Sequence, residues 1–217
     1  MAYKTVLGPS EGEVTEKKSR FLGYLLGVKT EAEAKNIIAS IKKAHHQSNH
    51  SCSAYRIRGQ QLTERYNDDG EPGGTAGMPM LEVLRGADLE NVLVVSTRYF
   101  GGTKLGTGGL VRAYTQSAQS ALAQAKLIEV GLYCRLMVDV DYGLSGKMEY
   151  YLNSHQHLLE DVHYSDFVTF SVYVAVDSLE EVQSQLIELT NDACKITKSD
   201  PIEAYVLDGK VITGERA

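Results

Sequence analysis

The chain has 217 residues, 43% of them hydrophobic, and a formal net charge of −6. It is long enough for one large domain or two small domains with cores of their own, and it contains neither an apolar run of the roughly 18 residues that a membrane span needs nor a recognisable signal peptide. The negative charge excludes a general polyanion binder, and we expect a cytoplasmic protein without membrane contact.

The first part of the chain mixes strands and helices. The residue pattern predicts strands around 3–7, 12–18, 20–28, 50–59, 61–67 and 91–98. It predicts a helix over 30–46, where Thr30 and Glu33 have capping-box spacing, and a short helix over 74–86. The clearest element is a further helix, because apolar and small residues recur at helical spacing from Leu110 to Ala125.

The pattern changes near residue 133. Strands are predicted over 133–142, 157–165, 166–177 and 194–207, and helices over 143–154 and 178–191, the second capped by Ser178. This βαββαβ order is typical of a ferredoxin-like domain. Residues 1–133 carry 16 Lys and Arg against 13 Asp and Glu, whereas residues 134–217 carry 6 against 15. We therefore predict an α+β protein with two domains, 1–132 and 133–217.

The segment STRYFGGTKLGTGGLVRAY, residues 96–114, joins a buried strand to the clearest helix. A strand, a glycine-rich loop and a helix in this order direct backbone N–H groups at phosphate, while aromatic rings stack on bases. The spacing matches neither GxxxxGK[ST] nor GxGxxG, so a purely structural loop is the alternative. The candidate phosphate- and nucleic acid-binding residues are Arg98, Tyr99, Phe100, Gly101, Gly102, Lys104, Gly106, Gly108, Gly109 and Arg112, with Arg56 as an extension of the basic surface.

This hypothesis requires Arg98, Lys104 and Arg112 to meet in one exposed cleft. It also requires a localised positive patch, because the chain as a whole is acidic. Binding to nucleic acid through such a patch weakens steeply with salt.

The segment NDDGEPGGTAGMP, residues 67–79, places three carboxylates within four residues. Carboxylates beside a phosphate suit Mg²⁺, but Asn, Asp, Gly and Pro are also the ordinary turn residues. We expect no resident cofactor or metal, with Mg²⁺ as the alternative. The candidate acidic surface consists of Asp68, Asp69, Glu71 and Thr75, and Gly73–Gly74–Thr75 forms a second candidate anion nest.

His50 and Cys52 lie two residues apart on a predicted strand, so their side chains face the same side of the sheet. A Cys–His nucleophile pair is one interpretation, and a small buried thiol is the other. The three cysteines, Cys52, Cys134 and Cys194, form no CxxC pair, which fits a reducing cytosol. Because no convincing nucleophile and base emerge, no enzymatic activity is assigned.

The block RYNDDGEPGGTAGMPMLEVLRGADLENVLVVSTRYFGGTKLGTGGLVRAY, residues 65–114, resembles the signature of the IMPACT family, the YigZ/YvyE group, in its bacterial two-domain form. The resemblance implies an N-terminal domain with the left-handed βαβ fold of ribosomal-protein and RNase PH-type domains. It implies a C-terminal ferredoxin-like domain similar to the last domain of elongation factor G. Eukaryotic relatives with an added N-terminal domain restrain a kinase in translational control. This sequence begins directly at the shared domain, so that kinase role is not carried over.

Three functions are compatible with these residues. The leading hypothesis is an RNA- or ribosome-binding protein linked to translation regulation, since family members are linked to nucleic-acid binding. The second is an enzyme that acts on a phosphorylated metabolite or an RNA end. In it, the glycine-rich loop within residues 96–114 would hold phosphate, and the acidic loop, residues 67–79, would hold a metal or serve as base. The third is a protein-interaction regulator without nucleic-acid contact.

Overall fold

The computed structural model describes residues 2–212, which divide into two compact units. One unit comprises residues 4–128, and the other comprises residues 129–212 with residues 2 and 3. Strand β7 (Leu127–Val140) runs through the expected boundary at 132/133, so the chain passes from one unit to the other within a strand. Within residues 2–212, every helix is too short or too polar to serve as a membrane span.

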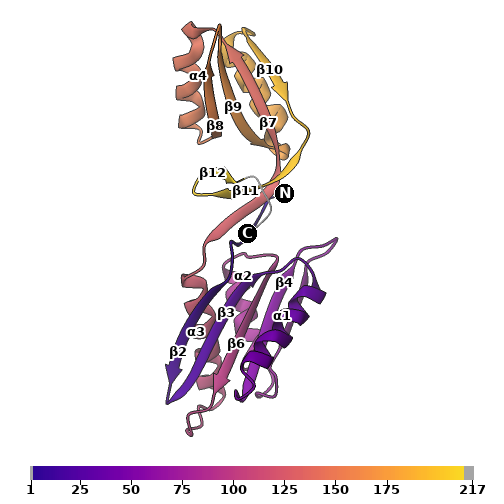
Figure 1. The fold of residues 1–217 in the computed structure, drawn as a ribbon, viewed down its shortest axis with the longest axis vertical. Coiled ribbons are helices and arrows are strands. Elements are labelled where there is room, and N and C mark those ends of the chain that lie inside the picture. Colours follow the sequence, from indigo (N-terminus) through magenta and orange to yellow (C-terminus); the bar gives the residue numbers. More distant parts are fainter. Residues whose placement is uncertain (1, 213–217) are drawn as a thin grey trace. The chain divides into compact units, whose positions relative to one another are not determined.

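The first unit is built on a five-stranded antiparallel sheet with the order β2-β3-β6-β4-β5 (Figure 1). The strands of this sheet are β2 (Ser10–Glu16), β3 (Ser19–Gly27), β4 (His50–Ile57), β5 (Thr63–Asn67) and β6 (Val92–Tyr99). Strand β1 (Tyr3–Val6) precedes them and pairs with β7. The apolar run of β6 is buried at the centre of the sheet, as its composition predicts.

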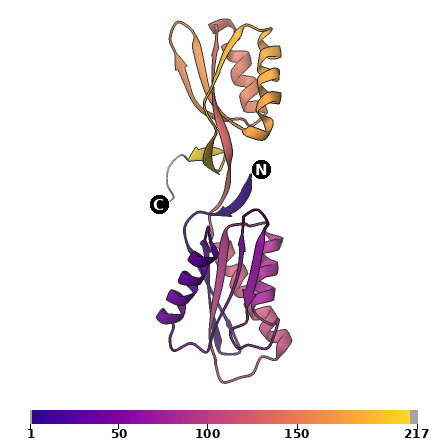
Figure 2. The same ribbon diagram turned by 90° about the vertical axis from the view of Figure 1, so that its right-hand side faces the viewer.

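Three helices cover the two faces of this sheet (Figure 2). Helix α1 (Glu31–Ala44) packs on one face, where Leu93 and Val95 point; α2 (Gly77–Gly86) and α3 (Thr107–Ala123) pack on the other, where Val92 and Val94 point. The predicted cap of α1 is confirmed, because the Thr30 Oγ1 accepts the Glu33 N–H at 3.1 Å.

Helix α3 lies unusually close to the sheet. A Cβ added at Gly23 would lie 2.4 Å from the Ser117 carbonyl oxygen, so no larger residue fits there. The Ser96 and Ser117 hydroxyls are 2.8 Å apart across the same contact. These contacts fix the position of α3, and therefore of its N-terminus, relative to β6.

The second unit has the predicted element order βαββαβ, with strands ordered β10-β7-β9-β8. Its remaining strands are β8 (Leu158–Tyr164), β9 (Val168–Ala175), β10 (Cys194–Lys198), β11 (Ile202–Leu207) and β12 (Lys210–Ile212). Its helices are α4 (Tyr142–Ser154), α5 (Leu179–Thr190) and the short 3₁₀ helix η1 (Val176–Ser178). Helices α4 and α5 cover one face of the sheet and enclose its core (Figure 1).

One prediction for this unit is wrong. The single strand over 194–207 is two strands, β10 and β11, which pair with successive parts of β7. Asp200 and Pro201 lie between them, and proline has no N–H to donate to a ladder. Ser178 is the N-cap residue of α5 as predicted, but its side chain accepts no capping hydrogen bond.

A partly buried ion-pair group ties β4 and β5 to α2. The Glu64 carboxylate accepts from the Arg56 Nε at 2.8 Å and from the Arg85 guanidinium. The Arg56 Nη1 also donates to the Leu89 carbonyl at 2.8 Å. Its hydrogen bonds with Arg85 and Arg56 hold the pKa of the Glu64 carboxyl below its ordinary value. The stability from this group is therefore present above the unfolded pKa and is lost as the pH falls through the lowered one.

We predict that Glu64→Gln lowers the free energy of unfolding by about 3 kcal/mol, because it leaves the Arg56 charge buried without its partner. Urea unfolding at neutral pH measures this loss. Glu82→Gln is the matched control, since Glu82 pairs with the same Arg85 but is 58% exposed, and it should change stability by less than about 1 kcal/mol. Equal effects of the two variants would contradict the prediction.

Candidate functional site

A cavity of about 460 Å³ lies between the end of β6, the acidic loop and the N-terminus of α3. We call it the α3 cavity. It is lined by Asn49, His50, Glu71, Pro72, Arg98, Phe100, Lys104, Leu105, Gly106, Thr107 and Leu110. The glycine-rich stretch and the acidic loop, noted separately in the sequence, therefore contribute to one site.

An ion pair between Glu71 and Arg98 forms part of the cavity wall. The Arg98 Nη1 donates to the Glu71 Oε1 at 2.7 Å, and the two side chains are 7% and 3% exposed. The guanidinium also lies 5.5 Å from the Phe21 ring centre and 5.4 Å from that of Phe100. The Arg98 Nε is buried and has no hydrogen-bond partner among residues 2–212. The charge of Arg98 is thus neutralised by Glu71, and its guanidinium lies between two aromatic rings, with the Nε–H left without an acceptor.

Tyr114 of α3 forms a further hydrogen bond with this ion pair. Its hydroxyl donates to the Glu71 Oε1 at 2.8 Å. Burial, with the neighbouring Cys52 and Glu71, raises the pKa of Tyr114 well above its ordinary value, so the phenol stays a donor. Burial likewise raises the pKa of the Cys52 thiol to about 12, and its Sγ donates to the Asp68 carbonyl at 3.0 Å. Cys52 is therefore a protonated core thiol and not an activated nucleophile.

His50 faces the cavity with a defined proton position. Its Nδ1 lies 2.8 Å from the Asp69 carbonyl oxygen, and because a carbonyl only accepts, Nδ1 carries the proton. Its Nε2 lies 4.0 Å from the Glu71 Oε2, too far for a hydrogen bond. In its neutral form the ring thus presents Nε2 as an acceptor beside a carboxylate oxygen.

The acidic loop is organised by its own aspartates. The Asp68 carboxylate accepts the N–H groups of Gly74, Ala76 and Gly77 at 2.8–3.0 Å. The Asp69 carboxylate pairs with Lys42 and accepts the Ser51 N–H. The Thr75 hydroxyl donates to the Pro72 carbonyl.

These hydrogen bonds show that Asp68, Asp69 and Thr75 stabilise the turn. In the predicted anion nest, the Gly74 and Thr75 N–H groups donate to acceptors within the same loop. No group of three or more His, Cys, Asp or Glu that suits a metal ion occurs in the described part of the chain. Of the acidic candidates, Glu71 alone lines the α3 cavity.

The glycines of the predicted loop differ in purpose. A Cβ at Gly101 would lie 2.0 Å from the Lys18 backbone, and Gly106 has φ of 72° just before α3, so both are required by the fold. Gly102, with φ of 85°, belongs with them. Gly108 lies in the first turn of α3, and a Cβ there would meet nothing within 4 Å. Packing therefore does not explain Gly108.

The remaining candidates separate into those at the cavity and those elsewhere. Phe100, 46% exposed, and Lys104 line it, and Lys104 forms no ion pair with any described residue. Tyr99 points to the opposite face of β6, where its hydroxyl lies 2.8 Å from the His45 Nδ1, because side chains alternate along a strand. Arg112 is exposed on α3 but does not line this cavity, so the expected meeting of Arg98, Lys104 and Arg112 in one exposed cleft is wrong. Arg56 is buried against Glu64 and Leu89.

Two features of the site carry no motif in the sequence. The Asn49 Oδ1 accepts the Phe100 N–H at 2.8 Å and so positions that aromatic residue from 51 residues away. Tyr114 was expected only as part of the buried face of α3. Both contacts depend on tertiary packing that periodicity does not report.

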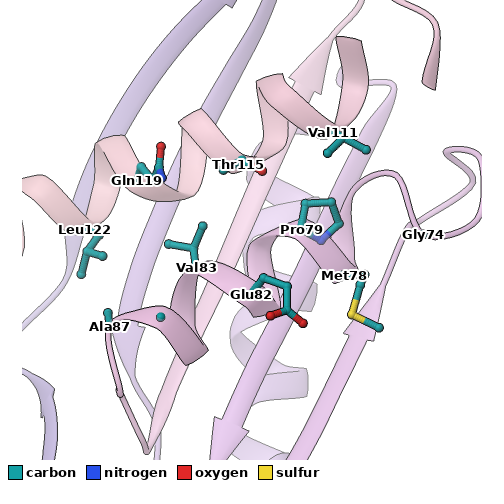
Figure 3. Close-up of a pocket in the computed structure, with 11 residues that line it drawn as sticks. Gly74, Met78, Pro79, Glu82, Val83, Ala87, Val111, Thr115, Gln119 and Leu122 are labelled. Atoms are coloured by element: carbon teal, nitrogen blue, oxygen red, sulfur yellow. The ribbon is translucent and has the colours of Figure 1, made fainter. Parts of the chain in front are cut away.

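A second hollow lies between α2 and α3 and is mainly apolar (Figure 3). Met78, Pro79 and Val83 of α2 face Val111 and Leu122 of α3 across it, with Glu82 at the edge. Of the residues that the sequence nominated for anion binding, Gly74 of the second candidate nest lines it, and the Gly74 N–H donates to Asp68.

Comparisons with known proteins place the chain in a family. Residues 17–122 match the model of the Impact N-terminal domain, and residues 138–193 match a domain of unknown function, DUF1949. The IMPACT family member YvyE of Bacillus subtilis is 42% identical over 199 residues, which cover 92% of each chain. The chain belongs to the IMPACT family.

Two further relatives agree with this assignment. The family member YigZ of Escherichia coli is 29% identical over 182 residues, covering 83% of this chain and 89% of that protein. A solved structure described as that of a hypothetical protein has a TM-score of 0.58 and 29% identity, and the match covers 90% of this chain and 96% of that one. The resemblance seen in the sequence block over 65–114 is thus confirmed.

We predict that Arg98→Met lowers the free energy of unfolding by roughly 3–5 kcal/mol, because it leaves the Glu71 carboxylate buried without its partner. Thermal and urea unfolding measure the loss. Lys104→Met, at an exposed position of the same cavity, should change stability by less than about 0.5 kcal/mol. A tolerated Arg98→Met would show that the ion pair does not hold the site together.

Proposed function

We propose that this chain binds RNA, in a role linked to translation regulation, by holding a strand phosphate between Lys104 and the N-terminus of α3. The observation that carries the proposal is the meeting of Lys104, Arg98 and that helix end on one cavity with Phe100 at its edge. The first N–H groups of α3 have no intrahelical acceptor, and Gly106, the N-cap, has no side chain to supply one. A helix N-terminus of this kind attracts anions.

The charge distribution supports a local contact with RNA. Because Arg98 is paired with Glu71, the cationic side chain left for a ligand in this cavity is Lys104. The protein then neutralises one phosphate, which agrees with its acidic composition. No cofactor is required. The expected likeness to ribosomal-protein, RNase PH-type and elongation factor G domains favours RNA by analogy, and the cysteine pattern favours the cytosol as the setting.

The first test is binding of labelled single-stranded RNA at several salt concentrations, followed by fluorescence anisotropy. One phosphate contact predicts that log K falls with log salt with a slope of about −0.7. Lys104→Ala should weaken binding about tenfold and remove most of that slope. Lys43→Ala, at an exposed position on α1, should change neither quantity. Absence of RNA binding at low salt would overturn the proposal.

Gly108→Ala tests the helix end separately. Alanine is the better helix former and meets no clash here, so we predict that stability stays equal or rises by up to about 1 kcal/mol. The added methyl group crowds the N–H groups that face the phosphate, so RNA affinity should fall about tenfold. A variant that is as stable and binds as tightly as the wild type would exclude the α3 N-terminus as the phosphate site.

An enzyme acting on the bound RNA is the second candidate function. His50, oriented by the Asp69 carbonyl, and Glu71 face the same cavity as the phosphate position, and a base oriented in this way suits proton transfer. Incubation of the chain with end-labelled RNA and analysis of the products separates the two functions, since a binding protein returns the RNA unchanged.

A further inference from the structure

The α3 cavity is lined by two kinds of hydrogen-bonding group. Lys104, the Thr107 hydroxyl and the first N–H groups of α3 are donors. The Glu71 Oε2 and the Nε2 of the neutral His50 ring are acceptors. A ligand that uses both kinds of group therefore carries an anion and hydrogen-bond donors.

Neither acceptor is used within the described part of the chain. The Glu71 Oε1 accepts both the Arg98 and the Tyr114 hydrogen bonds, whereas Oε2 accepts none. The His50 Nε2 lies 4.0 Å from it and accepts none either. Two adjacent acceptors match two adjacent donors on a ligand. Because a hydrogen bond to a carboxylate is charge-assisted, a ligand that supplies both donors gains affinity and selectivity.

A ribose with both hydroxyls free is a nucleic-acid group with two adjacent donors. Carboxylates bind ribose hydroxyls in this way in dinucleotide-binding proteins. Within an RNA strand the 3′ oxygen is esterified, so only the 3′-terminal nucleotide retains the complete diol. The same nucleotide carries a 5′ phosphate, which is the anion required at the N-terminus of α3.

The size and the edge of the cavity agree with a single nucleotide. Its volume of about 460 Å³ lies in the range of small-molecule sites. Phe100 is 46% exposed at the edge, and Asn49 holds its backbone in place. A base would stack on this ring, while its ribose and phosphate lie inside.

We propose that the α3 cavity takes a ribonucleoside 5′-phosphate with a free 2′,3′-diol, presented as the 3′ end of an RNA strand. This inference rests on the proposed RNA binding and adds the recognition of the end. Glu71 and His50 bind the diol, and Lys104 with the first turn of α3 binds the phosphate. A free mononucleotide has the same chemistry and is the other source of such a ligand.

The test compares three versions of one short RNA with the full-length wild-type chain. They are the linear strand with its 3′ diol, the same strand ending in a 2′,3′-dideoxynucleotide, and the circularised strand. We expect the dideoxy and circular versions to bind about tenfold to a hundredfold more weakly than the diol strand. AMP is the fourth probe, and displacement of the diol strand by AMP at an equal concentration would assign the site to a free nucleotide while upholding diol recognition.

A pair of variants tests whether His50 provides this selectivity. His50→Phe should reduce the preference for the diol over the dideoxy strand to within about twofold. His46→Phe, at an exposed position just after α1, should leave the preference intact. Should His50→Phe not fold, the comparison of the three strands with the wild-type chain decides by itself.

Failure of this inference is distinguishable from failure of the RNA proposal. Equal, Lys104-dependent binding of all three strands would overturn diol recognition and leave RNA binding in place. Absence of binding to every strand and to AMP would overturn both.

Discussion

The ion pair between Glu71 and Arg98 determines the geometry of the α3 cavity. Two charges removed from water are costly unless each finds close partners. Arg98 obtains them from Glu71 and two aromatic rings, and Glu71 obtains them from Arg98 and Tyr114. Because these residues belong to β6, the acidic loop and α3, the pair holds three elements together. The close packing of α3 on β3 at Gly23 then fixes where the helix begins.

The same pair determines which groups of the site remain for a ligand. Arg98 is paired with Glu71, which leaves Lys104 and the N-terminus of α3 as the positive groups. The second oxygen of Glu71, beside His50, remains as an acceptor. A protein with an acidic composition can therefore contact one phosphate without a broad basic surface. Recognition of this kind suits contact with a single nucleotide, and not with many nucleotides along a strand.

Local sequence patterns predict most of the fold, because the elements of both units bury faces with regular periodicity. The helix from Leu110 onward and the buried run of β6 are examples. The patterns fail where one residue interrupts a longer signal. Pro201 divides an expected strand, and the side chain of Ser178, the N-cap residue of α5, accepts no capping hydrogen bond.

The site is less predictable than the fold. Residue type and spacing nominate Arg98, Phe100 and Lys104 in one segment and Glu71 in another, and the fold brings the four to one cavity. They do not show that Arg98 is neutralised, since that depends on a contact with Glu71 across the chain. They also nominate Tyr99 for stacking, although strand alternation turns it toward His45. The glycines look alike in the sequence. A side chain at Gly101 would clash with the Lys18 backbone, whereas one at Gly108 would meet no neighbouring atom.

The most direct test of the account is an NMR titration of the ¹⁵N-labelled chain with AMP, followed at the backbone amides. We expect the Thr107, Gly108 and Gly109 N–H resonances to shift downfield and saturate together, because these groups donate to the phosphate. We also expect a shift of the His50 ring resonances at the same midpoint. Unchanged resonances at the α3 N-terminus, with shifts confined to residues 129–212, would contradict the claim that this cavity binds the nucleotide.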